Sequence, residues 1–494
     1  MYWTDKLNEM LNVLSGVVWG PWLIVLLVGT GLYLTFRLRF LQIRGFGHAL
    51  KCISGVYDDP SEKGDISHFQ ALCAALSATI GTGNIAGVAT AIAYGGPGAV
   101  FWMWVTALVG MATKFTSCSL AVKYRRVHAD GSASGGPMYY LRDGFKPKWL
   151  ENLVGDSKVR SIGAGLGFLF ALFTVFSSFG IGNMVQSNSV VDGLRFVVPE
   201  AWSGPAFTWM GFFEVKIFNL IVGLFLAGLV AMVILGGIKR IGRVATAIVP
   251  VMCCVYLLGA IVILLFNLKE IPSAFLLIFK QAFSNTQAMA GGFAGAVLAR
   301  TIRFGVARGV FSNESGLGSA PMAHAAAKTR EPIREGYVAM LGPFIDTILV
   351  CSMTALVIIV TGSWMEASAE KELVGAALSC HAFQKGLHFG DFTLGHIVVA
   401  FGLVFFAYST ILSWSYYGDR CAEYLLGPRA IRPYRILYCI AVVLGATGAL
   451  KMIWTIADIL NGLMAVPNLI ALIALGGWVV RGIKEYKRRV LISQ

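Results

Sequence analysis

Long apolar runs separated by short polar segments dominate the pattern along the chain. Eleven runs are long enough to cross a bilayer as helices, since the hydrocarbon core requires about 20 apolar residues. They cover residues 17–36, 69–94, 98–121, 163–188, 217–236, 244–266, 305–327, 337–362, 396–417, 434–450 and 455–480. The pattern predicts an all-α polytopic membrane protein with eleven transmembrane helices.

Composition supports a membrane protein with one domain. Hydrophobic residues make up 56% of the chain and charged residues 13%, about half the charged share of soluble domains. The run 17–36 follows no basic segment and has no small-residue cleavage site, so we expect a retained helix and not a signal peptide. No long linker divides the chain, which predicts a single membrane transport domain, 1–494. Cysteines lie mostly inside apolar runs, which argues against a disulfide or zinc framework.

Lysine and arginine are sorted between alternate connections. One set, residues 37–67, 122–160, 237–243, 328–335, 420–435 and 481–494, holds 28 of the 40. The other set, which includes the N-terminus, holds eight. Because cytoplasmic loops are enriched in these residues, we expect the N-terminus outside and the C-terminus in the cytoplasm. The net charge of +14 then reflects membrane orientation, and no nucleic-acid partner is expected.

Two of the predicted helices carry glycine and polar residues at their centres. Residues 77–87 read SATIGTGNIAG, and residues 311–319 read FSNESGLGS. If the first helix is set aside, five spans lie in 69–267 and five in 288–481, and an interrupted helix comes first in each group. Because five is odd, the two groups have inverted topology, and paired interrupted helices in inverted repeats indicate a binding site at the midplane.

The physical reason for the interruptions lies in the backbone. Unpaired N–H and C=O groups in hydrocarbon cost several kcal/mol each, so a broken helix persists only where it lines a cavity. Its free ends offer N–H donors to an anion and carbonyls to a cation. Gly83 and Gly87 also have the GxxxG spacing of close helix packing, and the segment superficially resembles a dinucleotide fingerprint. The matching second segment favours a ligand site over both alternatives.

Several long blocks resemble one family of carriers. ATIGTGNIAGVATAIAYGGPGAVFW, GVARGVFSNESGLGSAPMAHAAAKT, FIDTILVCSMTALVI and STILSWSYYG are similar to the alanine or glycine:cation symporter family of the APC superfamily. The resemblance covers essentially the whole chain. It implies the LeuT fold, a 5+5 inverted repeat, preceded here by one extra N-terminal helix. It also implies sodium-driven uptake of a small neutral amino acid, such as alanine or glycine, across a prokaryotic cytoplasmic (inner) membrane.

The resemblance also implies the residues of the site. The unwound segments match Ile80–Gly83 and Phe311–Glu314. Implied substrate-binding residues are Thr79, Gly81, Thr82, Gly83, Gln186, Phe311, Asn313, Thr410 and Trp414. A Na⁺ site would combine backbone carbonyls near Ser77 and Ile80 with the hydroxyls of Ser409 and Thr410. Neither the preferred amino acid nor its chirality follows from the resemblance.

Three of these residues also admit structural interpretations. Thr410 and Trp414 are four residues apart and share a helical face, where an indole would limit the size of a ligand. Alternatively, Thr410 bonds back to the carbonyl of Phe406, and Trp414 faces lipid. Gln186, near the end of the run 163–188, either pairs with a substrate group or is an interfacial glutamine.

Charged residues inside the spans leave further alternatives open. Glu314 either binds an ammonium group or a cation, or is a structural carboxylate answered by an arginine such as Arg308. Asp346 is a costly acid within a span and could assist a second cation, carry a proton or brace the bundle. For Lys114 we expect a helix-end lysine that snorkels to the interface.

Other functions remain as alternatives. A carrier of the same fold could take another small solute or couple to protons. A channel would require a continuous polar stripe or a ring of identical groups, which the sequence lacks. A membrane enzyme would require a nucleophile with a base or a His/Cys cluster, and the sequence shows neither. The predicted partners are the lipid bilayer and a small neutral amino acid, with no prediction of oligomeric state.

Overall fold

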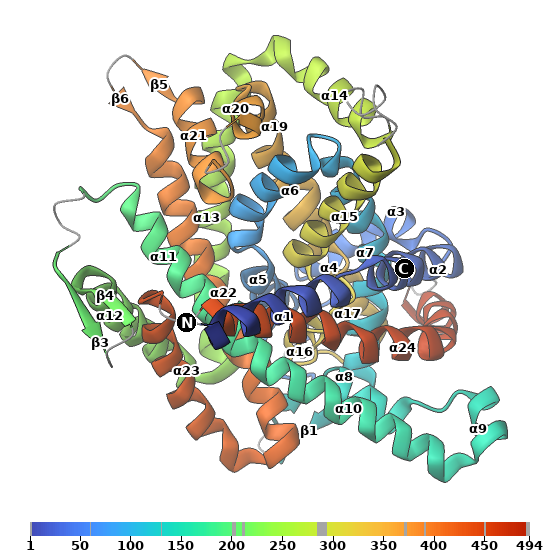
Figure 1. Cartoon of the computed structure of the whole chain (residues 1–494). Helices are drawn as coiled ribbons and strands as arrows, with labels where there is room; N and C mark the ends of the chain where they lie inside the picture. Colours follow the sequence, from blue (N-terminus) through green and yellow to red (C-terminus); the bar gives the residue numbers. More distant parts are fainter. Residues whose placement is uncertain are drawn as a thin grey trace.

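The structure is a computed structural model of the chain. It describes residues 2–59, 61–129, 131–199, 204–209, 213–283, 294–369, 373–389, 392–448 and 451–490. Nearly all of the described elements are helices, and they form one bundle (Figure 1). The chain begins with α1 (Tyr2–Val18), α2 (Pro21–Arg37), α3 (Leu41–Arg44) and α4 (Phe46–Ile53).

The first half of the bundle starts at a capped helix. Ser67 and Gln70 form a capping box, in which each side chain bonds the backbone N–H of the other. The elements are α5 (His68–Thr79), η1 (Gly83–Gly87), α6 (Val88–Gly95), α7 (Ala99–Lys123), β1 (Arg126–Val127), β2 (Ala133–Ser134), α8 (Pro137–Gly144), α9 (Lys148–Val154), α10 (Asp156–Phe179), η2 (Gly180–Met184), α11 (Val185–Arg195), β3 (Ala206–Trp209), β4 (Phe213–Lys216), α12 (Ile217–Ile234), α13 (Gly237–Phe266), η4 (Leu268–Glu270) and α14 (Ile271–Phe283).

The second half repeats the use of short helical pieces next to long ones. Its elements are α15 (Ala294–Asn313), α16 (Ala320–His324), α17 (Pro332–Ala339), α18 (Leu341–Pro343), η6 (Phe344–Cys351), α19 (Ser352–Val360), α20 (Ser363–Ala369), α21 (Ala376–Gly386), β5 (His388–Phe389), β6 (Phe392–Thr393), α22 (Gly395–Leu426), η7 (Pro428–Ala430), α23 (Ile431–Ala446) and α24 (Lys451–Val490). The strands form three antiparallel two-stranded hairpins, β1–β2, β3–β4 and β5–β6.

Eight helical stretches of the described residues are long and apolar enough to cross a membrane. A ninth span results if α5 and the helix Gly83–Gly95, bent by 54°, are counted as one. Two predicted runs are not among them: 305–327 is divided between α15 and α16, and α23, in 434–450, has only 16 residues. The multi-pass, all-α architecture is therefore present, while the count of eleven and the 5+5 arrangement remain predictions.

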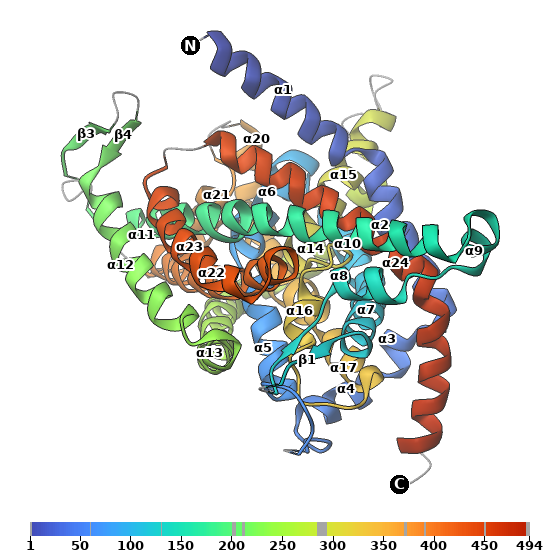
Figure 2. The ribbon, with the colours of Figure 1, turned by 90° about the horizontal axis from the view of Figure 1, so that it is seen from below.

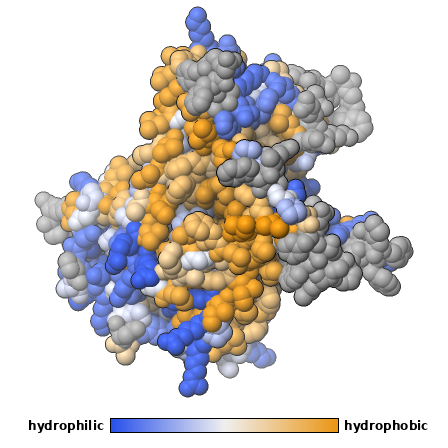
Figure 3. Space-filling view, turned by 90° about the vertical axis from the view of Figure 1, so that its left-hand side faces the viewer, coloured by the Kyte–Doolittle hydropathy of each residue, from blue (hydrophilic) through white to orange (hydrophobic). Residues whose placement is uncertain are grey.

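Burial separates the helices that line the interior from those that face lipid. α7 is the most enclosed span, with 89% of its apolar window buried, whereas the windows of α12 and α13 are 39% and 33% buried. Exposed apolar side chains such as Ile221 and Phe225 cover α12, and Leu258 lies exposed on α13. Figure 3 shows a broad apolar surface on one side of the molecule, as expected for contact with acyl chains.

The basic connections gather on one face of the molecule. One hollow on this face is lined by residues that include Lys63, Arg125, Thr329 and Arg489. A second hollow is lined by Asp65 and by residues within 128–133, 236–239 and 420–435. The start of α1 and the end of α24 lie at opposite ends of the molecule in Figure 2. We refer to the side formed by the six basic connections as the basic face.

Candidate functional site

The first predicted interruption is present between α5 and η1. Helix α5 ends at Thr79, Ile80 takes a non-helical conformation with ψ of 88°, and the chain resumes as a π-helix at Gly83. The N–H of Gly81, which no longer has a helical partner, donates to Oδ1 of Asn84 at 2.9 Å. The local sequence thus supplies its own replacement for one lost helical bond.

The second interruption follows α15. Helix α15 ends at Asn313, and Glu314 takes a left-handed backbone with φ of 54°, followed by Gly316 at φ 94° and Gly318 at φ 92°. These angles favour glycine, which explains the glycines of this segment. The break therefore begins later than the predicted unwound segment Phe311–Glu314, most of which is still helical.

The two interrupted segments touch at Gly83. A Cβ placed on Gly83 would lie 3.2 Å from Cα of Ser312 and 3.4 Å from Cδ1 of Phe311. Contacts of this length are tighter than most side chains tolerate, so the absence of a side chain allows the approach. The chain that follows the first break therefore packs against the end of α15, directly before the second break.

A buried carboxylate joins the two broken helices. Asp346, in η6, accepts from Nδ2 of Asn84 at 2.7 Å, from Oγ of Ser312 at 2.9 Å and from Oγ1 of Thr347 at 2.7 Å. Asn313 extends the cluster through a 3.1 Å bond to Thr347. All five side chains are buried. One acid therefore receives donors from both breaks, an arrangement that places at least four side-chain oxygens close together.

A second group of oxygens lies where α5 faces α22. The carbonyl of Ser77 accepts from Oγ1 of Thr410 at 3.1 Å and from Oγ of Ser409 at 3.3 Å. Both hydroxyls also bond back to the carbonyl of Phe406 at 2.9 Å, and Oγ of Ser77 donates to the carbonyl of Ser409 at 2.7 Å. The back-bond of Thr410 is thus real, but it accompanies a cross-helix contact.

Unpartnered polar atoms mark the space beside the first break. A Cβ on Gly81 would lie 2.6 Å from Oγ1 of Thr410 and 3.5 Å from Oε1 of Gln186. Among the described residues, the buried Oε1 of Gln186, Oγ of Ser413 and Oγ of Ser315 have no hydrogen-bond partner. Because buried polar groups are normally paired, the unpartnered Oε1 of Gln186 beside Gly81 and the unpartnered Oγ of Ser315 in the second break indicate room for a polar ligand.

Trp414, one helical turn after Thr410, is buried against η2. The indole is 2% exposed, and its Cβ fits against Gly182 so closely that a side chain there would collide with it. The lipid-facing interpretation of Trp414 is therefore wrong. The ring of Tyr417 lies next to the indole, with 5.6 Å between the ring centroids.

Residues 4–492 match the sequence profile of the sodium:alanine symporter family. The chain belongs to this family. The predicted resemblance is confirmed, and so is the expectation of a transporter in place of an enzyme.

Two full-length relatives support the assignment to the sodium:alanine symporter family. The chain is 47% identical over 479 residues to the sodium/alanine symporter AgcS of Methanococcus maripaludis, and the match covers 97% of each chain. It is 46% identical over 488 residues to an uncharacterized transporter of Haemophilus influenzae, and that match covers 99% of this chain and 98% of the relative. The protein is therefore a multi-pass membrane transporter of this family.

A solved structure shows the same fold. The crystal structure of MhsT in complex with L-phenylalanine matches with a TM-score of 0.54 and 14% identity, over 85% of this chain and 90% of the MhsT chain. At this identity the likeness concerns the fold alone. It agrees with the LeuT-type architecture that the sequence predicts for the sodium:alanine symporter family.

The surroundings of Gln186 and Arg308 differ from those predicted from the sequence. Gln186 is not at a helix end, because α10, η2 and α11 run continuously and α11 ends at Arg195. Arg308 does not pair with Glu314. Its Cζ lies 5.7 Å from the centroid of the Phe311 ring, and its guanidinium interacts electrostatically with Asp458. The sequence missed both because it fixes neither helix ends nor the facing of side chains.

Lys114 does not snorkel to an interface. It is 2% exposed and lies near enough to Glu314 and Asp346 to interact electrostatically with both. Glu314 itself accepts from Oγ of Ser319 at 2.6 Å. A buried lysine close to two buried acids offsets part of their charge, which lowers the cost of burying these acids in a membrane.

The site residues predicted from the sequence did not include Asn84, Ser312 and Thr347, which all contact Asp346. The sequence did contain an indication of Asn84 and Ser312. A buried acid within a span requires hydrogen-bond donors, and these two polar residues lie in the two interrupted segments. What the sequence did not reveal was that η6 carries Asp346 to the point where the interrupted helices meet.

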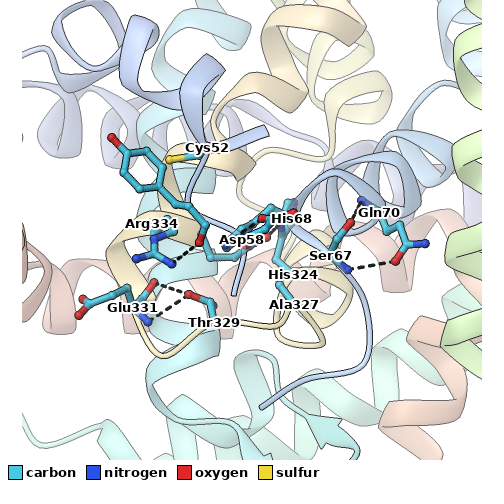
Figure 4. A network of polar contacts seen from close by, with 12 residues as sticks. Cys52, Asp58, Ser67, His68, Gln70, His324, Ala327, Thr329, Glu331 and Arg334 are labelled. Atoms are coloured by element: carbon cyan, nitrogen blue, oxygen red, sulfur yellow. Dashed lines mark hydrogen bonds and ion pairs between the residues drawn. The ribbon is translucent and has the colours of Figure 1, made fainter. Parts of the chain in front are cut away.

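A separate polar network ties together the basic face. The carboxylate of Glu335, on α17, contacts Nδ1 of His324 at 2.6 Å and Nδ1 of His68. All three side chains are at most 1% exposed. Figure 4 shows His68 and His324 side by side, with Asp58 next to His68. The network therefore joins the starts of α5 and α17 to α16, which follows the second break.

Backbone contacts close the same region. Ile66 and Ala327 form a parallel bridge, and the guanidinium of Arg125 donates to the carbonyls of Ala325, Ala327 and Thr329 at 2.8, 2.6 and 2.5 Å. The segments before α5 and after α16 are thus held together on the basic face. These bonds are ones that must break if the site is to open on that side.

We predict that Glu335→Ala lowers the free energy of unfolding by about 3 kcal/mol or more, because it leaves two buried histidines without their partner. SDS titration in mixed micelles measures the change. Glu366→Ala is the matched control, since Glu366 also pairs with a histidine, His381, but is 42% exposed. We expect the control to cost less than about 1 kcal/mol. Equal losses in the two variants would contradict a special role for the buried network.

Proposed function

We propose that this protein is a sodium-coupled symporter that carries a small neutral amino acid, alanine or glycine, into the cell by alternating access. The observation that supports the proposal most strongly is the contact between the two interrupted helices at Gly83 and Ser312. Free backbone groups of both breaks then face one space, and that space can take a zwitterion and a cation together.

The substrate half of the proposal rests on size and polarity. Gly81 leaves room beside Gln186 and Thr410, and Trp414 limits that room on one side. The unpartnered amide oxygen of Gln186 is suited to accept from an ammonium group. A compact, polar space of this kind favours an amino acid with a small side chain. The residues that we assign to the substrate site in addition to these are Thr79, Thr82, Gly83, Phe311 and Asn313.

The proposed cation site is supported by a group of backbone and hydroxyl oxygen atoms. Ser77, Ser409 and Thr410 bring a carbonyl and two hydroxyls together, and the carbonyl of Ile80 is freed by the break. Hard oxygen ligands suit a hard cation such as Na⁺. The cluster around Asp346, to which both breaks contribute donors, is a second oxygen-rich place for a cation next to the substrate space.

The free energy released by one co-transported cation is large enough to drive accumulation of the amino acid. Inward movement of one positive charge across about 100 mV releases roughly 2.3 kcal/mol, and a tenfold cation gradient adds about 1.4 kcal/mol. One co-transported cation then supports roughly 500-fold accumulation of a neutral solute. We place the protein in a prokaryotic cytoplasmic membrane with the basic face, and hence the C-terminus, inside and the N-terminus outside.

Proton coupling is the second candidate. The buried acids Asp346 and Glu314 favour it, because either carboxylate could take up a proton at the site in place of a bound cation. Proteoliposomes that contain the purified protein separate the two. We expect radiolabelled alanine to accumulate when an inward Na⁺ gradient is imposed and not with K⁺ alone. Accumulation driven by a pH gradient without Na⁺ would favour the proton.

Thr410→Ala tests the cation site directly. We expect the sodium concentration for half-maximal alanine uptake to rise about five- to tenfold, the equivalent of about 1 kcal/mol for one lost hydroxyl. A high sodium concentration should restore much of the apparent alanine affinity, because the substitution weakens alanine binding only through the thermodynamic coupling of alanine to sodium. Ser415→Ala is the control, since Ser415 bonds its own helix at Leu412. If alanine affinity falls equally at all sodium concentrations, Thr410 is a substrate ligand only.

Trp414→Ala tests the size limit of the site. Removal of the indole leaves a void beside the substrate, so we expect leucine and methionine to compete for alanine uptake about tenfold better than in the parent. Trp104→Ala on α7, whose indole bonds Ser352, serves as the control. Unchanged selectivity in Trp414→Ala would place the substrate elsewhere.

A further inference from the structure

A pocket with an unusual charge lies on the basic face, away from the two breaks. It measures about 230 Å³ and lies between the end of α2, the short helices α3 and α4, and the last part of α24. Five permanent cations line it: Arg37, Arg39, Arg44, Lys484 and Lys487. No acidic residue is among its lining residues in the described part of the chain. The pocket is thus a concave, purely cationic site.

The five cations are not neutralised by the protein. Among the described residues, none of them forms an ion pair with an acid. The neighbouring hollow that contains Lys63 and Arg125 differs, because Glu331 and Glu485 also line it and Glu331 pairs with Arg489 at 3.2 Å. Enrichment of basic residues on this face therefore does not by itself explain a pocket without acids. Like charges this close together favour a bound anion.

His48, on α4, also lines the pocket. Burial lowers its pKa, and the neighbouring cations Lys51, Arg334 and Lys487 lower it further. Its Nε2 forms a 2.9 Å hydrogen bond with the hydroxyl of Tyr486.

Each of three exposed apolar side chains is adjacent in sequence to an arginine that lines the pocket. Phe36, Phe40 and Ile43 are 64%, 45% and 70% exposed. Phe36 ends the membrane-crossing stretch that closes at Arg37, so these side chains lie at the level where headgroups meet acyl chains. A cationic pocket beside exposed apolar groups at this level matches a ligand with a phosphate and a hydrocarbon tail.

We propose that this pocket binds the phosphate headgroup of an anionic phospholipid from the cytoplasmic leaflet. The proposal rests on the orientation given above, in which the basic face is cytoplasmic. The phosphate contacts the arginines and lysines of α2, α3 and α24, and the acyl chains lie along Phe36 and Ile43. The lipid thereby links the extra N-terminal helices to the C-terminal helix.

The back of the pocket connects the lipid to the network that closes the basic face. Tyr337 lines the pocket and packs against Gly45 so closely that a side chain there would collide with it. Tyr337 lies on α17, two residues after Glu335, which holds His68 and His324. A bound headgroup thus braces the helix that holds the start of α5 and the end of α16.

Native mass spectrometry of the purified full chain tests the proposal. We expect phosphatidylglycerol to remain bound, with phosphatidylcholine exchanged away, and the triple variant R39Q/R44Q/K487Q to lose at least about tenfold of the bound phosphatidylglycerol. The control is K146Q/K148Q/K158Q, which removes the same charge from exposed lysines of another basic connection. The control should retain the lipid.

Three results would overturn the proposal. Equal loss in both triple variants would mean diffuse attraction to the basic face. Equal retention of phosphatidylcholine would mean no headgroup recognition. Displacement of phosphatidylglycerol by millimolar glycerol phosphate would identify a site for free phosphate. Because lipid retention is measured without substrate or sodium, it can fail while transport succeeds, and the reverse.

Discussion

Alanine uptake by Gly81→Ala falls by about 100-fold or more. The added Cβ would lie 2.6 Å from Oγ1 of Thr410, which is well inside an ordinary contact, and it would fill the space next to Oε1 of Gln186. Thr410 or the backbone must then shift by up to about 1 Å, and displacements of that size can cost about 100-fold in rate. Initial rates of radiolabelled alanine uptake measure the effect.

Gly87→Ala is the matched control for this substitution. Gly87 is the last residue of the π-helix η1 that follows the break at Gly81, and a Cβ placed on Gly87 meets nothing within 4 Å. We expect uptake within about twofold of the parent, because the added methyl group occupies open space. Both variants should elute as the parent does in detergent. A fully active Gly81→Ala would show that substrate and cation do not use the space at the first break.

Asp346→Asn abolishes the activation of uptake by sodium. The substitution keeps the shape of the side chain but removes the charge that accepts donors from Asn84, Ser312 and Thr347. Loss of a buried charged partner costs about 3 kcal/mol, or about 100-fold in cation affinity. Sodium titrations of alanine uptake, at a fixed membrane potential, measure the loss.

Asp192→Asn controls for the loss of one carboxylate. Asp192 bonds Asn188 on α11 and lies outside both interruptions, so sodium activation should stay within about twofold of the parent. If Asp346→Asn keeps its sodium activation and loses only the dependence of uptake on pH, Asp346 carries a proton. If neither dependence changes, Asp346 braces the bundle.

The two interruptions could be predicted from the sequence because clustered glycine and polar residues weaken a helix at the centre of an apolar run. Gly81 and Gly83 lie where the first helix breaks, and Gly316 and Gly318 take the left-handed angles of the second. Local backbone chemistry of this kind can be read from residue type alone. The same holds for the sorting of basic residues to one face, since charge distribution follows loop position.

Contacts between distant segments were not predictable in this way. Lys114 resembles an interfacial lysine until α7 is seen to be enclosed, and Glu314 resembles a partner of Arg308 until Lys114 is seen beside it. Asn84 and Asp346 are 262 residues apart, and only the packing of η6 against η1 brings them together. Sequence patterns report which face of a helix is apolar, but the neighbour that covers it depends on the tertiary arrangement.

We propose that both interrupted helices form a single site in which cation and amino acid favour each other's binding. The most direct measurement is the equilibrium binding of radiolabelled alanine to the purified protein over a range of Na⁺ concentrations, with K⁺ replacing Na⁺ to hold ionic strength constant. We predict that Na⁺ tightens alanine binding by about 10-fold or more and that alanine tightens Na⁺ binding by the same factor, since linkage is reciprocal. Alanine affinity that is identical in Na⁺ and K⁺ would contradict the claim.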